Sequence, residues 1–268
     1  MNESSYEDML YEVDGGVATI TINRPDRLNA LRQSSMVEMA DAINRSNRDD
    51  GVGVIVITGS GERAFCAGGD LGSVASSDTD GRNNLGQEEL MMWLAAFRQC
   101  GKPTIAKVRG YCIGLGNELN LLCDLTIAGE SAQFGQAGPK VGSVPMVGGT
   151  QLLPLVCGFK RAKEILFLCR RYSGQAAVDM GLANIVVPDD RLDDEVASWS
   201  AELLAKAPQS LRIGKMSLSY LFDLQWPAMQ HALELTGWMV GSEEMREGAK
   251  AFMEKRPPNF RPGIQGDT

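Results

Sequence analysis

The sequence of 268 residues contains a single histidine, His231, and no C-x-x-C pair among its six cysteines. Transition-metal sites are built mainly from histidine and closely spaced cysteine ligands, so no metal centre is expected. The cysteines stand mostly among apolar residues and are expected to be buried, reduced thiols. A Ser-His-Asp triad would depend on His231, which lies in a predicted C-terminal helix and is interpreted as structural.

The sequence also lacks the features of membrane proteins and nucleic-acid-binding proteins. No apolar run approaches the roughly 20 residues of a membrane span, and residues 1–11 carry acids where a signal peptide would be apolar. The net charge is −8 and there is no basic stripe. We therefore expect a cytoplasmic protein, with neither a membrane nor a nucleic acid as its partner.

The composition itself is that of an ordinary globular protein, with 44% hydrophobic and 22% charged residues. Apolar patterning predicts strands at residues 16–22, 52–58, 103–108, 125–128 and 185–187. Helical spacing of apolar residues predicts helices at residues 36–43, 90–97, 119–123, 160–169 and 176–180. This alternation of strands and helices is typical of an α/β architecture.

The chain changes character near residue 200. From residue 193 onward the pattern is almost entirely helical, and its clearest segments are 203–220, 227–240 and 243–254. This predicts two regions, a core at residues 1–200 and a helical region at residues 201–268. Within the core, residues 72–84 are dominated by Ser, Asp and Gly, and we expect a mobile loop there.

Two glycine-rich segments, Ala67-Gly68-Gly69-Asp70 and Gly114-Leu115-Gly116, each follow a predicted strand; the first lies in residues 64–71, expected to form a loop. Neither is a dinucleotide-binding or Walker-type phosphate-binding motif. Small residues let backbone N–H groups approach a ligand closely, and two N–H groups directed at one oxygen stabilise an oxyanion. Glycine-rich segments are also common as simple turns, so both interpretations stay open at this point.

Glu118 follows the second glycine segment and stands at the start of an otherwise apolar helix. A carboxylate at a helix N-terminus is stabilised by the helix dipole, so one interpretation is a helix cap. The other is a general acid/base that shares a pocket with the N–H groups of the glycine segments.

Several motifs, in the same order along the chain, resemble the enoyl-CoA hydratase/isomerase family, also called the crotonase superfamily. They are NRPDRLNAL at residues 23–31, AFCAGGDL at 64–71, GYCIGLGNEL at 110–119, CDLTIAGESAQFGQ at 123–136 and REGAKAFMEKRPPNF at 246–260. The resemblance implies a crotonase-type core of repeated ββα turns, followed by C-terminal helices that drive formation of a trimer or a hexamer. It also implies an acyl-CoA thioester substrate and no separate cofactor, since CoA is part of the substrate.

The resemblance further implies which residues form the site. The thioester carbonyl would lie between the backbone N–H groups of Gly69 and Leu115, with Glu118 as the catalytic carboxylate. The residues expected around the substrate are Arg27, Leu28, Ala67, Gly68, Asp70, Leu71, Tyr111, Gly114, Gln136, Gly138, Ser143, Phe252 and Lys255.

The resemblance leaves the reaction itself open. Hydratases of the family carry two glutamates, and the second position corresponds here to Gly138, so Glu118 would be the sole carboxylate. The favoured activity is hydration or dehydration of an enoyl-CoA through a thioester enolate, with Glu118 handling both proton transfers in turn.

A narrower resemblance supports a different reaction. Residues 124–144 and 159–188 look most like 1,4-dihydroxy-2-naphthoyl-CoA synthases and 2-ketocyclohexanecarboxyl-CoA hydrolases, which close or open a ring by Dieckmann or retro-Dieckmann chemistry. Some naphthoyl synthases use bound bicarbonate as a base, and Gln136 and Ser143 match the residues that hold it. The chain departs from this subgroup at Glu118, Pro145 and Val240. An acyl-CoA binder with little catalytic activity is the third alternative.

Overall fold

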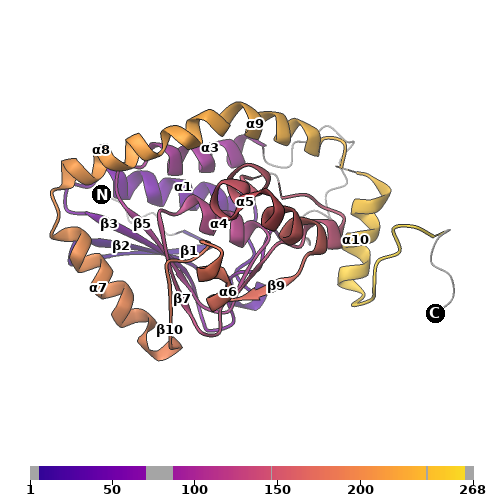
Figure 1. Cartoon of the computed structure of the whole chain (residues 1–268), viewed down its shortest axis with the longest axis horizontal. Helices are drawn as coiled ribbons and strands as arrows, with labels where there is room; N and C mark the ends of the chain where they lie inside the picture. Colours follow the sequence, from indigo (N-terminus) through magenta and orange to yellow (C-terminus); the bar gives the residue numbers. More distant parts are fainter. Residues whose placement is uncertain (1–5, 71–86, 146, 240, 263–268) are drawn as a thin grey trace.

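A computed structural model describes residues 6–70, 87–145, 147–239 and 241–262 of the chain. The loop expected at residues 72–84 and the expected substrate contact Leu71 lie outside the described residues. The described part forms two sheets covered by helices (Figure 1). This confirms the expected α/β class.

The larger sheet has six strands in the order β1, β2, β3, β5, β7 and β10. Their bounds are β1 Met9–Asp14, β2 Val17–Ile22, β3 Val54–Gly59, β5 Thr104–Val108, β7 Leu125–Gly129 and β10 Ile185–Val187. Strand β1 pairs antiparallel with β2, and the other neighbours pair in parallel. Strand β1 has no counterpart among the predicted strands, because its MLYEVD sequence is acidic and largely exposed at the sheet edge.

The smaller sheet has four short strands in the order β4, β6, β8 and β9. Their bounds are β4 Ala64–Cys66, β6 Tyr111–Ile113, β8 Gln133–Gly135 and β9 Arg171–Ser173. Strand β4 lies in the segment predicted as a loop, and it is a strand because it pairs with β6. Strands β4, β6 and β8 each follow a strand of the larger sheet and precede a helix. The expected ββα turns are therefore confirmed.

The apolar run VIVIT in β3 is buried because helices cover the larger sheet on both faces. Ile55 and Ile57 face the main core, under α1 (Gln33–Arg48) and α3 (Gln87–Gln99). Val54 and Val56 face the opposite way, into a second cluster with residues of α7 (Leu192–Leu204). In Figure 1, α1 and α3 lie on one side of the sheet and α7 lies on the other.

Several helices are longer than their apolar spacing predicts. Helix α1 continues through the polar residues 44–47, where Ser46 is buried and its hydroxyl donates to the Ala42 carbonyl. Helix α5 spans Gly149–Leu168, with a kink at Gly158, which has a φ of 77°. The other helices near the sheets are α4 Leu115–Leu122, α6 Gly174–Asp179 and the 3₁₀ turns η1 Pro25–Arg27, η2 Gly138–Val141 and η3 Asp189–Arg191.

The C-terminal region contains α8 (Pro208–Leu218), α9 (Tyr220–Thr236) and α10 (Glu243–Met253). The single helix predicted at residues 203–220 is wrong, because α7 ends at Leu204 and Pro208 opens a new helix. The boundary expected after residue 200 falls inside α7, which packs on strands of the larger sheet. None of the described helices combines the length and apolar character needed to cross a bilayer.

Candidate active site

The two glycine-rich segments meet at the ends of β4 and β6. These strands pair in parallel, so their C-terminal ends share one edge of the smaller sheet. A Cβ on Gly114 would lie 3.7 Å from the Cα of Gly68, and a Cβ on Gly68 would lie 4.0 Å from the backbone nitrogen of Leu115. Both glycines have positive φ, 125° at Gly68 and 59° at Gly114. Glycine at these positions therefore permits both the backbone conformation and the close approach.

The N–H group of Gly69 has no acceptor within the described part of the chain. Gly69 forms a parallel bridge with Leu31, in which the Leu31 N–H donates to the Gly68 carbonyl and the Asp70 N–H donates to the Leu31 carbonyl, both at 2.9 Å. In such a bridge the N–H of the central residue points away from the partner segment. A Cβ on Gly69 would meet no atom within 4 Å, so this residue borders open space.

Leu115 supplies the second N–H group. It is the first residue of α4, and the N–H groups of a first helical turn have no partner within the helix. The preceding Gly114 donates its own N–H to the Gly135 carbonyl and provides no side-chain cap. Among the described residues, the Leu115 N–H is therefore unpaired. It lies beside Gly68, next to the segment that carries the Gly69 N–H.

Glu118 lies one turn along α4 from Leu115, on the same face of the helix. Its side chain does not cap α4. It reaches the N-terminus of α5, where Oε1 accepts hydrogen bonds from the N–H groups of Val147 at 2.7 Å and Gly149 at 3.0 Å. The α5 dipole stabilises an anion at this position. In the described residues Oε2 has no such bond, which leaves it available to a substrate.

Burial dominates the electrostatics of Glu118. The residue is 3% exposed, and burial raises the pKa of its carboxyl to about 7. The hydrogen bonds from Gly149 and Val147 oppose this rise, because they stabilise the ionised form. A carboxyl with a pKa near neutrality both accepts and donates a proton at physiological pH.

Gly138 lies in a turn with no room for a side chain. The Ser143 N–H donates to the Gly138 carbonyl at 2.8 Å. A Cβ on Gly138 would lie 2.8 Å from the Ser143 carbonyl oxygen and 3.1 Å from the Cα of Val144. The backbone therefore closes over the position where the family's second glutamate was expected.

Two buried amide side chains complete the neighbourhood. Gln136 follows β8, and Asn117 lies in α4 next to Glu118. Both are almost fully buried, and neither amide has a hydrogen-bond partner among the described residues. Buried amides are usually paired, so these two are candidates for contact with a polar ligand.

The other expected substrate contacts fall into three groups. Arg27 and Leu28 lie beside the first glycine segment, since the Ala67 N–H donates to the Leu28 carbonyl at 3.0 Å. The ring of Tyr111 is covered by the guanidinium of Arg171, 4.8 Å from the ring centroid. Phe252 and Lys255 are exposed at the end of α10, which packs on η2; no contact among the described residues brings them to the glycine segments.

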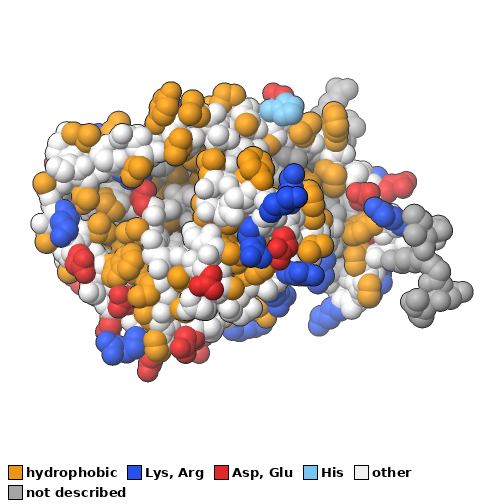
Figure 2. Space-filling model, in the orientation of Figure 1, with side chains coloured by type: hydrophobic (Ala, Val, Ile, Leu, Met, Phe, Trp, Pro, Cys, Tyr) orange, Lys and Arg blue, Asp and Glu red, His pale blue; other side chains and the backbone are white. Residues whose placement is uncertain are grey.

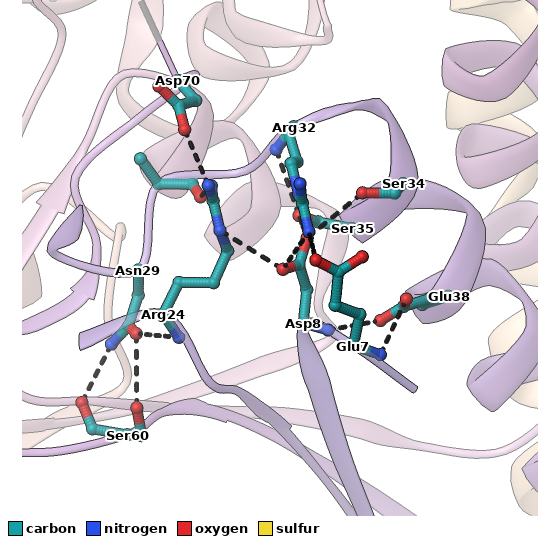
Figure 3. A network of polar contacts seen from close by, with 11 residues as sticks. Glu7, Asp8, Arg24, Asn29, Arg32, Ser34, Ser35, Glu38, Ser60 and Asp70 are labelled. Atoms are coloured by element: carbon teal, nitrogen blue, oxygen red, sulfur yellow. Dashed lines mark hydrogen bonds and ion pairs between the residues drawn. The ribbon is translucent and has the colours of Figure 1, made fainter. Parts of the chain in front are cut away.

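Sequence reasoning missed two parts of the site. One is the pair of backbone donors to Glu118, for which the adjacent Gly148-Gly149 was the available signal. The other is Arg24, whose guanidinium contacts Asp70 (Figure 3). Asp70 is therefore held by an ion pair with a side chain that lies 46 residues away in the sequence.

The nearby thiols do not provide a nucleophile. All six cysteines are free, and burial raises the pKa of Cys66 to about 12. Burial also raises the pKa of Cys112 well above its usual value. Such thiols stay protonated and unreactive at neutral pH.

The chain matches the family model described as "Enoyl-CoA hydratase/isomerase" over residues 12–263. It is similar to an enoyl-CoA hydratase from Mycobacterium avium subsp. paratuberculosis K-10, with 29% identity, a TM-score of 0.86 and coverage of 96% of this chain and 100% of that chain. It is similar to an enoyl-CoA hydratase/isomerase from Xanthobacter autotrophicus Py2, with 34% identity, a TM-score of 0.84 and coverage of 94% and 98%. A carnitinyl-CoA dehydratase from Mycobacterium avium 104 gives 32% identity, a TM-score of 0.83 and coverage of 91% and 96%. The chain therefore belongs to the enoyl-CoA hydratase/isomerase family.

Proposed function

We propose that the protein adds water to, or removes water from, the double bond of an enoyl-CoA thioester. The observation that carries this proposal is the position of Glu118. Its carboxyl is buried and has a pKa of about 7. It lies one helical turn from Leu115, whose N–H is unpaired among the residues that the structure describes. An acid/base beside an oxyanion donor is what chemistry at the α and β carbons of a thioester requires.

The N–H groups of Gly69 and Leu115 would receive the thioester carbonyl oxygen. When a nucleophile attacks Cβ, negative charge moves to this oxygen and forms an enolate. Two backbone donors fixed by strand and helix geometry need no reorganisation to stabilise it, and each is worth roughly 3 kcal/mol. The Leu115 side chain does not interfere with donation, because the donor is its backbone N–H.

Glu118 would move one proton twice. Its ionised carboxylate takes a proton from water while the water oxygen attacks Cβ, and the electron pair of the double bond moves to the enolate. The protonated carboxyl then gives the same proton to Cα, and the carbonyl re-forms. The net change is addition of one water, and the reverse sequence is dehydration. A second carboxylate is not needed if Glu118 reaches both carbons in turn.

The similar structures support this class of reaction. Two of them are named an enoyl-CoA hydratase and a carnitinyl-CoA dehydratase, and both names describe adding or removing water next to a thioester.

The second candidate is opening or closing of a ring in a cyclic β-oxoacyl-CoA. The observation that favours it is the buried amide of Gln136, which has no partner among the described residues and is available to a bicarbonate base. Ser143, expected to share that role, is close to Gly138 in the same turn. This candidate ranks second because Glu118 already provides a carboxylate, which makes a bound anion unnecessary as the base.

The test is mass spectrometry after incubation with linear and cyclic enoyl-CoAs and with cyclic β-oxoacyl-CoAs, with and without bicarbonate. We expect a gain of one water on an enoyl-CoA. Glu118→Gln should reduce the rate by roughly 10²- to 10⁴-fold, because it removes the acid/base. Glu130→Gln is the matched control, since Glu130 is exposed and lies outside the site.

Other outcomes would contradict the proposal in different ways. Full hydratase activity in Glu118→Gln would remove Glu118 from the mechanism. A bicarbonate-dependent, ring-opened product would establish the second candidate. Tight binding of the CoA esters without turnover would identify an acyl-CoA binder.

A further inference from the structure

We propose that Arg24 is a positioning residue that holds the Gly69 N–H group in place beside the Leu115 N–H group. The inference rests on the proposed oxyanion role of Gly69. Arg24 lies between β2 and η1, more than 40 residues before Gly69 in the sequence. Its guanidinium contacts Asp70, Ala30 and Asp8, so it would act through the segment that carries Gly69.

The guanidinium of Arg24 makes three separate contacts, and Figure 3 labels two of the partners, Asp8 and Asp70. Its Nη2 lies 2.8 Å from Asp70 Oδ2, its Nη1 donates to the Ala30 carbonyl, and its Nε lies 3.3 Å from Asp8 Oδ1. The Arg24 side chain is 13% exposed, so solvent screens these contacts only weakly. A planar group with five donors suits three acceptors in different directions.

These contacts hold both sides of the bridge that orients Gly69. Asp70 directly follows Gly69. Ala30 directly precedes Leu31, which is the bridge partner of Gly69. Arg24 therefore links the two segments from one side, while backbone hydrogen bonds link them directly. If Arg24 were lost, the segment of Gly69 would keep its backbone hydrogen bonds to the segment of Leu31 but would lose this side-chain link.

The backbone of Arg24 is itself fixed through Asn29. The Arg24 N–H donates to Asn29 Oδ1 at 3.0 Å, and the Asn29 N–H donates to the Arg24 carbonyl at 2.9 Å. The Asn29 amide also donates to the Ala64 carbonyl at the start of β4, at 2.7 Å. Leu28 and Asn29 have φ values of 52° and 56°, a conformation that non-glycine residues adopt only when surrounding contacts impose it.

Asp8 is the buried carboxylate that both Arg24 and Arg32 contact. It is 3% exposed, and both of its carboxylate oxygens accept from Arg32, at 2.7 and 2.9 Å. Burial alone would raise the pKa of Asp8, but hydrogen bonds from Arg32 and Ser35 and the charge of Arg24 hold it below its usual value. Arg32 thus shares Asp8 with Arg24, yet among the described residues it contacts no part of the glycine segment.

This difference supplies a matched pair of variants, Arg24→Lys and Arg32→Lys. Each weakens an ion pair with Asp8, but only Arg24→Lys loosens the segment that carries Gly69. We expect Arg24→Lys to lower kcat by about 10- to 100-fold while KM changes less than about threefold, because a misplaced donor affects the enolate more than the bound substrate. Arg32→Lys should keep kcat within about threefold of the wild type.

Hydrogen exchange measures the same effect without relying on turnover. The Ala67 and Asp70 amides donate to the carbonyls of Leu28 and Leu31, so they report on the segment around Gly69. Their exchange should be about tenfold faster in Arg24→Lys and unchanged in Arg32→Lys. If the wild type turned over no acyl-CoA, the proposed function would fail, and the exchange data would still decide whether Arg24 holds this segment.

Two results would overturn the inference. One is wild-type kcat and wild-type exchange in Arg24→Lys. The other is an equal loss of kcat in Arg24→Lys and Arg32→Lys. That result would show that kcat depends on the ion pairs of Asp8 and not on the contact between Arg24 and Asp70. If Arg24→Lys fails to fold, Asp70→Asn replaces it. That variant leaves Arg24 bound to Asp8 and Ala30, and the same loss of kcat is expected.

Discussion

Glu118 combines two properties that oppose each other, burial and ionisation. Its ordinary pKa of 4.5 rises to about 7 in the folded protein. Between these pH values the folded state keeps a proton that the unfolded state has lost, so stability falls as pH rises through this window and stays lower above it. The difference amounts to about 3 kcal/mol. The group that we propose for catalysis therefore destabilises the fold at the pH where it is ionised.

Glu118→Gln should accordingly stabilise the protein in a pH-dependent way. The amide oxygen can still accept from Val147 and Gly149, and the amide carries no charge that needs solvation. We expect the free energy of unfolding to rise by up to about 3 kcal/mol at pH 8 and to change little at pH 4. Urea unfolding at both pH values measures this. A gain as large at pH 4 as at pH 8 would mean that the burial of charge is not the cause.

The η2 turn shows how one short element determines the chemistry available to the site. Gly138 lies against the backbone of Ser143 and Val144, and Pro145 comes directly after these residues. Pro145 and Glu118 Oε1 would both touch a Cβ placed on Gly149. The turn at Gly138 therefore lies in the same stretch of backbone as Val147 and Gly149, whose N–H groups donate to Glu118.

Gly138→Ala should destabilise the protein and reduce its activity together. The added methyl group would meet backbone atoms, which cannot rotate away as a flexible side chain can, so residues 143–144 must shift. We expect a loss of about 1–3 kcal/mol in the free energy of unfolding and a lower kcat. Gly138→Glu would meet the same obstacle and would not supply a second working carboxylate.

A matched control exists in α8. A Cβ on Gly214 would meet no atom within 4 Å, so Gly214→Ala should be neutral or stabilise the helix by up to about 1 kcal/mol. Thermal and urea unfolding of the two alanine variants side by side provide the measurement. Equal stability of Gly138→Ala and the wild type would show that the turn adapts to a side chain.

The elements differ in how far sequence predicts them. Strand β3 was predictable from local composition alone, because a continuous apolar run is typical of a strand that is buried on both faces. Strands β1 and β4 were not, because an exposed edge strand without regular alternation and a strand of three residues are defined by their pairing and not by their own composition. In the site, Glu118 and the glycine segments stand out as motifs. The Val147 and Gly149 amides and Arg24 do not, since backbone groups and remote ion pairs leave little trace in sequence.

At the scale of the whole molecule, the surface is unusually apolar along the C-terminal helices. Large hydrophobic side chains of α8 and α9 are exposed, among them Met216 at 61%, Leu218 at 77% and Leu221 at 58%. Figure 2 shows hydrophobic side chains along the upper edge, where α8 and α9 lie in Figure 1. An exposed apolar face of this extent is typical of a subunit interface. We therefore propose that copies of the chain associate through α8 and α9.

The double variant Leu218→Glu and Leu221→Glu should separate the assembly into monomers. Two carboxylates on an apolar interface would have to lose their hydration without gaining a partner, which opposes association strongly. Size-exclusion chromatography with light scattering measures the mass, and a trimer or hexamer is expected for the wild type. Val13→Glu is the control, because Val13 is also apolar and 45% exposed but belongs to strand β1 and not to these helices. A monomeric wild type, or a double variant with the wild-type mass, would show that this face does not join subunits.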